Sequence, residues 1–418
     1  MKKLLTLTAL GLVLTCSEAY SSGFYLKEQS ASAQGNAYAG ATAGAEDISY
    51  SYFNPAALSR FKGSNVYAGG TWIAPKSTAH NASNSFGEHN DYMGDIVHSA
   101  ASPHAYISQQ INDDLTIGLS LNAPFGMITK YGDDWAGRNH GTLSKIISAT
   151  FTPMASYKVN DQLSLGAGLP IQYIRATLRN GVIAGVNPLT GALIEDKSTV
   201  HGDTIDVGYQ LGALYEPIEG TRFGAGYRSQ VRHKIKGDIE FDGPLSMLNQ
   251  DLSCRLTTPA TLTLGAYHDI NEDWAVMAEY SRVYWSSFNR LIMQGAQSGQ
   301  LSYTDEKWKD TDFYALGVSK QLDSQWKLRL GLAYEKGAVG NEYRTPRIPD
   351  SNRLWYSAGL QYQYNEKLTF NVGYTHIVAD SSKVSLRGDH TGDARRGALD
   401  VSYHSKINII AASISYNF

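Results

Sequence analysis

The chain has 418 residues, with 36 basic and 39 acidic side chains and a net charge of −3, so its charge gives no basis for binding nucleic acid. Its mean hydropathy of −0.29, with no apolar run after the first 15 residues long enough to span a bilayer, argues against a bundle of membrane helices. The presence of 40 glycines and 27 tyrosines but only two cysteines argues against a disulfide scaffold and favours many strands with aromatic surface positions.

Residues 1–21 have the order of a secretory signal peptide. Residues 1–3 are basic, residues 4–14 are apolar but too few to span a bilayer, and small residues follow. Cleavage after Ser21 is preferred over cleavage after Ala19. A lipid attachment site at Cys16 is disfavoured by the residues that precede it.

Residues 22–62 are rich in alanine, glycine and serine and do not alternate between apolar and polar. Two interpretations remain open, a compact plug inside the lumen of a barrel and a disordered periplasmic arm. Small residues that pack closely against a wall favour the plug.

From residue 63 the dominant period is two, which is typical of strands with one apolar face. A soluble sandwich also shows this pattern, because one face of each of its sheets is buried. The clearest runs share one face as follows: Leu115, Ile117, Leu119 and Leu121; Trp326, Leu328, Leu330, Leu332 and Tyr334; Leu368, Phe370, Val372 and Tyr374.

The rhythm of the connections favours a membrane barrel over a sandwich. Short polar turns recur about every 50 residues, and a longer irregular segment lies between each pair and at each end. The short turns are Asn112-Asp113-Asp114, Asn160-Asp161, Pro217-Ile218-Glu219-Gly220, Asn271-Glu272-Asp273, Asp323-Ser324 and Asn365-Glu366. The expected long loops are 74–97, 123–143, 179–200, 237–256, 287–309, 336–352 and 381–399. Six short turns and seven long loops predict an all-β, 14-stranded antiparallel transmembrane β-barrel over residues 63–418.

The C-terminus supports the same fold. Ile410, Ile414, Tyr416 and Phe418 share one face of the last strand, and an aromatic final residue on an alternating strand is typical of outer-membrane barrels. Closure of the barrel leaves no strand edge facing hydrocarbon.

Several stretches, in order along the chain, resemble the FadL family of outer-membrane transporters for long-chain fatty acids and other hydrophobic compounds. They are Ser22-Gly23-Phe24, Glu46-Asp47 before Asn54-Pro55-Ala56, Asn122-Ala123-Pro124-Phe125-Gly126, Trp135-Ala136-Gly137-Arg138, Trp285-Ser286-Ser287-Phe288 and residues 348–355.

The resemblance implies a monomer in the outer membrane of a Gram-negative cell, surrounded by outer-membrane lipid and lipopolysaccharide. Its barrel is closed by an N-terminal hatch, residues 22–62, and it takes up long-chain fatty acids passively. The ligand binds inside near Phe24, the hatch rearranges, and the ligand leaves sideways where Pro124 and Gly126 interrupt the third strand. Asn54, Pro55 and Ala56 correspond to the hatch element beside this opening.

Arg175 is the candidate partner for the fatty-acid carboxylate, because an arginine forms paired hydrogen bonds with it. Its parity is a difficulty: Leu165, Ile171 and Tyr173 share its face and are expected to face lipid, so Arg175 points inward only if Pro170 shifts the register. The family's second basic group aligns with Thr304, which weakens the fatty-acid interpretation and leaves Lys307 or Lys309 as substitutes.

Other functions remain as alternatives. These are a channel for uncharged hydrophobic molecules such as aromatic hydrocarbons, an outer-membrane enzyme, and a porin-like channel that also serves as an adhesin or phage receptor. The sequence contains no recognised catalytic motif and no metal-ligand spacing, so we expect no enzyme activity, no cofactor and no metal. Cys254, the one cysteine left after signal removal, is interpreted as a tolerated small residue.

Overall fold

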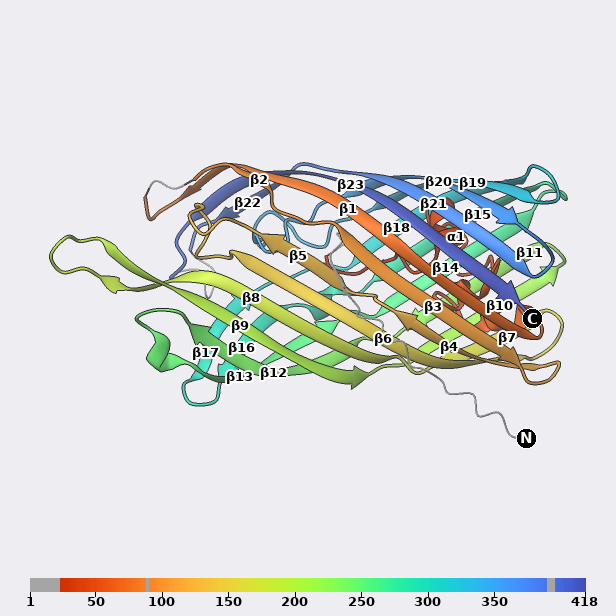
Figure 1. Ribbon diagram of the computed structural model, residues 1–418, viewed down its shortest axis with the longest axis horizontal. Coiled ribbons are helices and arrows are strands. Elements are labelled where there is room, and N and C mark those ends of the chain that lie inside the picture. Colours follow the sequence, from red (N-terminus) through yellow and green to blue (C-terminus); the bar gives the residue numbers. More distant parts are fainter. Residues whose placement is uncertain (1–22, 88–89, 389–394) are drawn as a thin grey trace, which may run out of the picture.

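The chain forms a closed barrel with residues 23–62 inside (Figure 1). The computed structural model describes residues 23–87, 90–388 and 395–418, so the expected signal peptide, 1–21, lies outside the described residues. All ladders are antiparallel, and the barrel closes where β1 (Ser64–Asn84) pairs with β23 (Leu399–Asn417).

The described strands form the 14 crossings of the barrel wall predicted from the sequence. Each crossing, here called a stave, consists of one strand or of two strands in line. Seven staves are single strands: β1, β23, β3 (Ala100–Gln110), β6 (Leu143–Lys158), β19 (Trp326–Glu335), β20 (Arg353–Gln363) and β21 (Leu368–Ala379). Seven staves are interrupted and comprise two strands each: β4 (Leu115–Asn122) with β5 (Gly126–Lys130), β7 (Leu163–Gly168) with β8 (Ile171–Val186), β9 (Leu193–Val207) with β10 (Gln210–Ile218), β11 (Thr221–Arg228) with β12 (Val231–Phe241), β13 (Gln250–Thr258) with β14 (Thr261–Asp269), β15 (Trp274–Val283) with β16 (Arg290–Gly295), and β17 (Gly299–Asp305) with β18 (Thr311–Gln321). Two short strands, β2 (Met93–Asp95) and β22 (Ser382–Leu386), lie in the long loops.

The six short turns are confirmed, and five of them share one chemical device. The side-chain oxygen of the first turn residue accepts hydrogen bonds from two backbone N–H groups, which closes the turn. The residues that do this are Asn112, Asn160, Asn271, Asp323 and Asn365.

Four expected long loops, 74–97, 179–200, 237–256 and 287–309, are shorter than predicted because strands continue through much of them. The β8–β9 ladder, for example, runs on to Val186↔Leu193 and forms the hairpin that projects from one end of the barrel in Figure 1. Beyond the bilayer the outer face no longer contacts hydrocarbon, so the ladder persists without the apolar alternation that marks strands in the sequence.

Residues 23–62, here called the hatch, fill the lumen, as expected of a plug. They contain one short helix, α1 (Ala31–Gly35), and two 3₁₀ helices, η1 (Ile48–Tyr52) and η2 (Pro55–Arg60). Side chains of Ser30, Asp47 and Asn54 cap these helices. Small residues of the hatch have a steric reason: a Cβ on Gly35 would lie 2.9 Å from the Cα of Gly359 in β20.

Two 3₁₀ helices of one turn lie outside the hatch: η3 (Ser246–Leu248) in the loop between β12 and β13, and η4 (Trp285–Ser287) in the interruption between β15 and β16. Across the described ranges, no helix has the length and apolar character needed to cross a membrane.

Candidate functional site

The lumen on the side of the long loops contains a basin that leads into a small apolar cavity. The basin has a volume of about 910 Å³ and the inner cavity about 60 Å³. Leu178, Val200, Leu291 and Met293 line both, so the two spaces adjoin. The inner cavity ends on Phe24 and has room for about two water molecules.

Arg347, from the loop between β19 and β20, lies where the basin meets the inner cavity. Among the described residues its guanidinium donates to three acceptors, all neutral: the carbonyl of Leu143 (3.0 Å), Ser144 Oγ (3.0 Å) and Asn180 Oδ1 (3.1 Å). Burial, and then repulsion by Arg396, lower the pKa of Arg347. An arginine nevertheless stays charged at neutral pH, so this position favours an anionic ligand.

Arg396 supplies a second cation beside the basin. Its guanidinium donates to Thr304 Oγ1 (3.3 Å) and Ser302 Oγ (3.2 Å). Thr304 aligns with the family's second basic group, so Arg396 brings a positive charge to that position from another loop. Lys307 instead donates to Tyr343 Oη (2.7 Å) and is exposed, and Lys309 is exposed as well. Glu306 is the opposing charge, since it lines both spaces and accepts from Trp308 Nε1 at 3.1 Å.

Aromatic rings surround Phe24 at the floor of the cavity. Its ring centroid lies 4.7 Å from that of Trp285, 5.8 Å from Phe288 and 5.9 Å from Trp308. Gly23 precedes it with φ +66°, and a Cβ there would lie 2.4 Å from the Trp308 ring. Only glycine therefore allows Phe24 to enter this cluster.

The third stave is interrupted at residues 123–125, so Pro124 lies in the interruption and Gly126 begins β5. The β3–β4 ladder ends at Ala105↔Leu121, and β5 pairs only with β6 among the described strands. Residues 23–29, here called the arm, occupy the interruption. The N–H of Leu26 donates to the carbonyl of Pro124 (2.8 Å), and the N–H of Gly126 donates to the carbonyl of Phe24 (3.0 Å).

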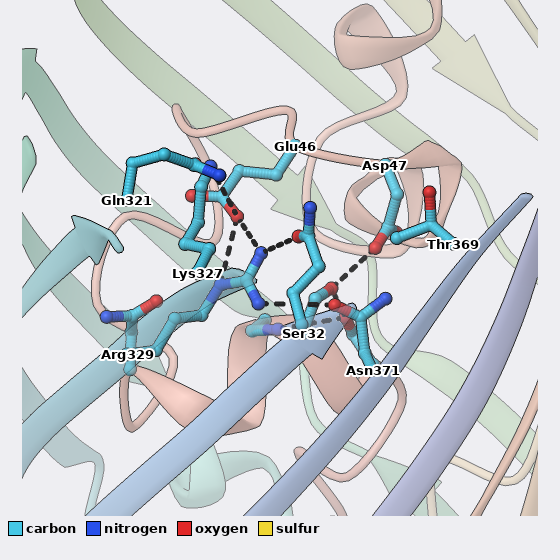
Figure 2. A network of polar contacts seen from close by, with 12 residues as sticks. Ser32, Glu46, Asp47, Gln321, Lys327, Arg329, Thr369 and Asn371 are labelled. Carbon is cyan, nitrogen blue, oxygen red and sulfur yellow. Dashed lines mark hydrogen bonds and ion pairs between the residues drawn. The ribbon is translucent and has the colours of Figure 1, made fainter. Parts of the chain in front are cut away.

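The hatch is also held to another part of the wall, β19–β21, by buried polar contacts around Glu46 (Figure 2). Glu46 accepts two hydrogen bonds from Arg329, one of them from Nε at 3.0 Å. Arg329 also donates to Asn371 Oδ1 (3.2 Å), and Lys327 lies 4.0 Å from Glu46. Inward charges of the wall therefore hold the hatch in place.

Asn54, Pro55 and Ala56 pack against β6, β7 and β10, and β6 borders the interrupted stave. Asn54 Nδ2 donates to the carbonyl of Ala213 in β10 (2.9 Å), and the carbonyl of Ala56 accepts from Ser156 in β6 (3.0 Å). A Cβ on Gly166 would lie 2.3 Å from the N of Ala56, which explains glycine there.

Arg175 does not reach the cavity in this structure. The register does not shift at Pro170, and Arg175 is exposed on the outer face while its neighbours Ile174 and Ala176 turn inward. The expected inward position is therefore wrong, because the alternation runs unbroken from Ile171. Arg347 occupies the interior position instead, and sequence reasoning missed it because loop residues carry no periodicity.

The family model described as "Outer membrane protein transport protein (OMPP1/FadL/TodX)" matches residues 12–418. The chain belongs to this family. It is 27% identical over 402 residues to a long-chain fatty acid transport protein of Salmonella typhi, with 90% of this chain and 92% of that one covered.

Two solved structures share the fold. A FadL homologue of Pseudomonas aeruginosa has a TM-score of 0.86 and is 24% identical in sequence. The match covers 95% of this chain and 100% of the homologue. The toluene transporter TodX of Pseudomonas putida has a TM-score of 0.70 and is 18% identical in sequence. The match covers 95% of this chain and 100% of TodX. The barrel and the family together identify a FadL-family protein of the outer membrane.

Proposed function

We propose that this FadL-family protein takes up long-chain fatty acids passively, as a monomer and without catalysis. The observation that carries the proposal is Arg347, a half-buried cation at the entrance to an apolar cavity, whose hydrogen-bond acceptors among the described residues are all neutral. A fatty acid places its carboxylate on the guanidinium and its alkyl chain in the cavity, where each buried methylene contributes about 0.8 kcal/mol. The name of the Salmonella typhi relative supports the same substrate class.

The small volume of the cavity implies that the arm moves during transport. A space of about 60 Å³ does not hold a long alkyl chain, and Phe24 is the arm residue that limits it. Displacement of Phe24 enlarges the cavity and breaks the hydrogen bonds that hold the arm to Pro124 and Gly126. Deeper ligand binding is thereby coupled to opening of the wall between β3 and β5, through which the ligand leaves.

A second substrate class has one observation in its favour. Glu306 lines the same spaces as Arg347, and its carboxylate would repel that of a fatty acid. An uncharged substrate such as an aromatic hydrocarbon avoids this repulsion.

Uptake of labelled oleate by a Gram-negative strain that lacks its own fatty-acid transporter tests the proposal. We expect the wild-type chain to restore uptake and Arg347→Ala to reduce it at least about tenfold, since a charge-assisted hydrogen bond is lost. Arg175→Ala is the matched control, because its guanidinium lies outside, and should transport as the wild type does. If toluene but not oleate enters, the fatty-acid assignment is wrong. If Arg347→Ala transports oleate normally, the assignment of the carboxylate to Arg347 is wrong.

A further inference from the structure

Five cations gather on the outer face of the barrel, on three of four consecutive strands in the order β8, β9, β12 and β13. Arg175 lies on β8, Arg232, Lys234 and Lys236 on β12, and Arg255 on β13, and all five are exposed. Their chain neighbours Ile174, His233, Ile235 and Cys254 are buried, so the five side chains point away from the lumen. We call these five residues the basic patch.

The ladders place the basic patch in adjacent rows. Lys234 lies directly opposite Arg255, and Arg175 and Lys236 are both register partners of Asp203 on β9, which lies between them. Like charges directly opposite each other in a sheet are destabilising unless something neutralises them.

The protein itself supplies little neutralisation. In the part of the chain that the structure describes, no carboxylate oxygen lies within 4 Å of a charged nitrogen of the five cations. This holds for Asp203 too, although it is the register partner of two of them. The next row contains Asp238 and Asp251, and Asp238 is already 3.2 Å from His201. The basic patch therefore carries an excess of positive charge.

The height of the basic patch on the barrel matches the outer boundary of the bilayer. Arg232 lies 11 residues after Thr221, which follows a short turn. At about 3.3 Å per residue and a tilt of about 40°, this places Arg232 roughly 28 Å above that turn, close to the height of the apolar band of such barrels. Directly below are exposed apolar side chains, Ile205 (63% exposed), Val207 (54%) and Tyr209 (50%).

We propose that the basic patch binds lipopolysaccharide, the phosphorylated glycolipid of the outer leaflet. Its phosphates accept hydrogen bonds from Lys234, Lys236 and Arg255, and its acyl chains lie on the apolar band below. The several phosphates of this lipid match the cross-strand pair Lys234 and Arg255, and its several acyl chains match the exposed apolar side chains below that pair. This site faces the membrane and is separate from the transport route, so it does not depend on the proposed function.

Native mass spectrometry of the purified full barrel in a neutral detergent tests this site. The probes are diphosphoryl lipid A, its dephosphorylated form, phosphatidylglycerol and inorganic phosphate. We expect diphosphoryl lipid A to bind one molecule per barrel, and Lys234→Gln/Arg255→Gln to weaken its binding at least about tenfold. Added salt should weaken binding as well.

The matched control is Lys320→Gln/Lys367→Gln, which removes two cations from the opposite end of the barrel and should bind lipid A as the wild type does. Circular dichroism establishes that both variants contain folded barrels. Equal binding of lipid A by the Lys234→Gln/Arg255→Gln barrel overturns the proposal. Equal affinity of the wild type for phosphatidylglycerol or for dephosphorylated lipid A also overturns it, because lipopolysaccharide would then not be the specific occupant.

Discussion

Tyr25 and Phe125 are register partners in an isolated antiparallel bridge, which joins the arm of the hatch to the interruption of the third stave. Their ring centroids lie 5.6 Å apart. Hydrogen bonds flank the bridge on both sides, so the two residues form a non-hydrogen-bonded pair with closely spaced Cα atoms. This bridge fills the gap in the wall that the missing β3–β5 ladder leaves.

A disulfide across this bridge should stop transport. In a Cys254→Ala background, Tyr25→Cys/Phe125→Cys brings two thiols to a spacing that a disulfide tolerates. We expect oxidation to abolish oleate uptake, because the arm then stays in the opening, and a reductant to restore it. Each single cysteine variant serves as a control for the substitution itself.

The same experiment distinguishes movement of the arm from movement of the whole hatch. A Cβ on Gly373 would lie 3.3 Å from that of Gln34, so Gln34→Cys/Gly373→Cys links the body of the hatch to β21. The same Cβ would lie 2.8 Å from the carbonyl oxygen of Ala31, so the reduced variant is the control for the local shift that this contact requires. We expect this disulfide to leave uptake close to normal. Loss of uptake on oxidation would mean that the entire hatch must move.

Gly23→Ala should dislodge Phe24 from its aromatic cluster. The left-handed backbone costs an alanine about 1–2 kcal/mol, and the added methyl group overlaps the Trp308 ring. We expect the arm to become sensitive to limited proteolysis while circular dichroism of the barrel is unchanged. Gly70→Ala is the control, because a Cβ at Gly70 meets no atom within 4 Å. An arm that stays protected in Gly23→Ala would show that the cluster does not hold it.

Removal of one partner of the Glu46–Arg329 pair should loosen the hatch. Arg329 is 1% exposed and Glu46 8%, so Arg329→Ala leaves a buried carboxylate without its main partner, at a cost of about 3–5 kcal/mol. The readout is protease cleavage between residues 40 and 50. A double variant, Glu46→Gln/Arg329→Gln, should recover part of the protection, because no unpaired charge remains, and additive effects would argue against a coupled pair.

Filling the inner cavity should block transport without changing charge. Cys254 lines this cavity, so Cys254→Trp places a large ring in a space of about 60 Å³. We expect oleate uptake to fall at least about tenfold, whereas Cys254→Ala should transport normally because it removes only one heavy atom. Normal uptake by a folded Cys254→Trp barrel would place the ligand route elsewhere.

The sequence by itself determined the barrel, its 14 staves and the position of the six short turns. Lipid forces every outward side chain from Leu115 to Leu121 to be apolar, and an asparagine such as Asn112 closes a turn by purely local hydrogen bonds, so both leave a signal along the chain. The same alternation places Arg175 outside, so the inward position expected from the family resemblance was wrong.

Only the tertiary structure decided what lies inside. Arg347, Arg396 and Phe24 are far apart in the chain and come from two loops and the arm, so no spacing in the sequence relates them. Likewise the pairing of Glu46 with Arg329 depends on how the hatch is oriented in the lumen. These contacts form only when the barrel closes around the hatch, which has no periodicity of its own. Local sequence patterns therefore do not predict them.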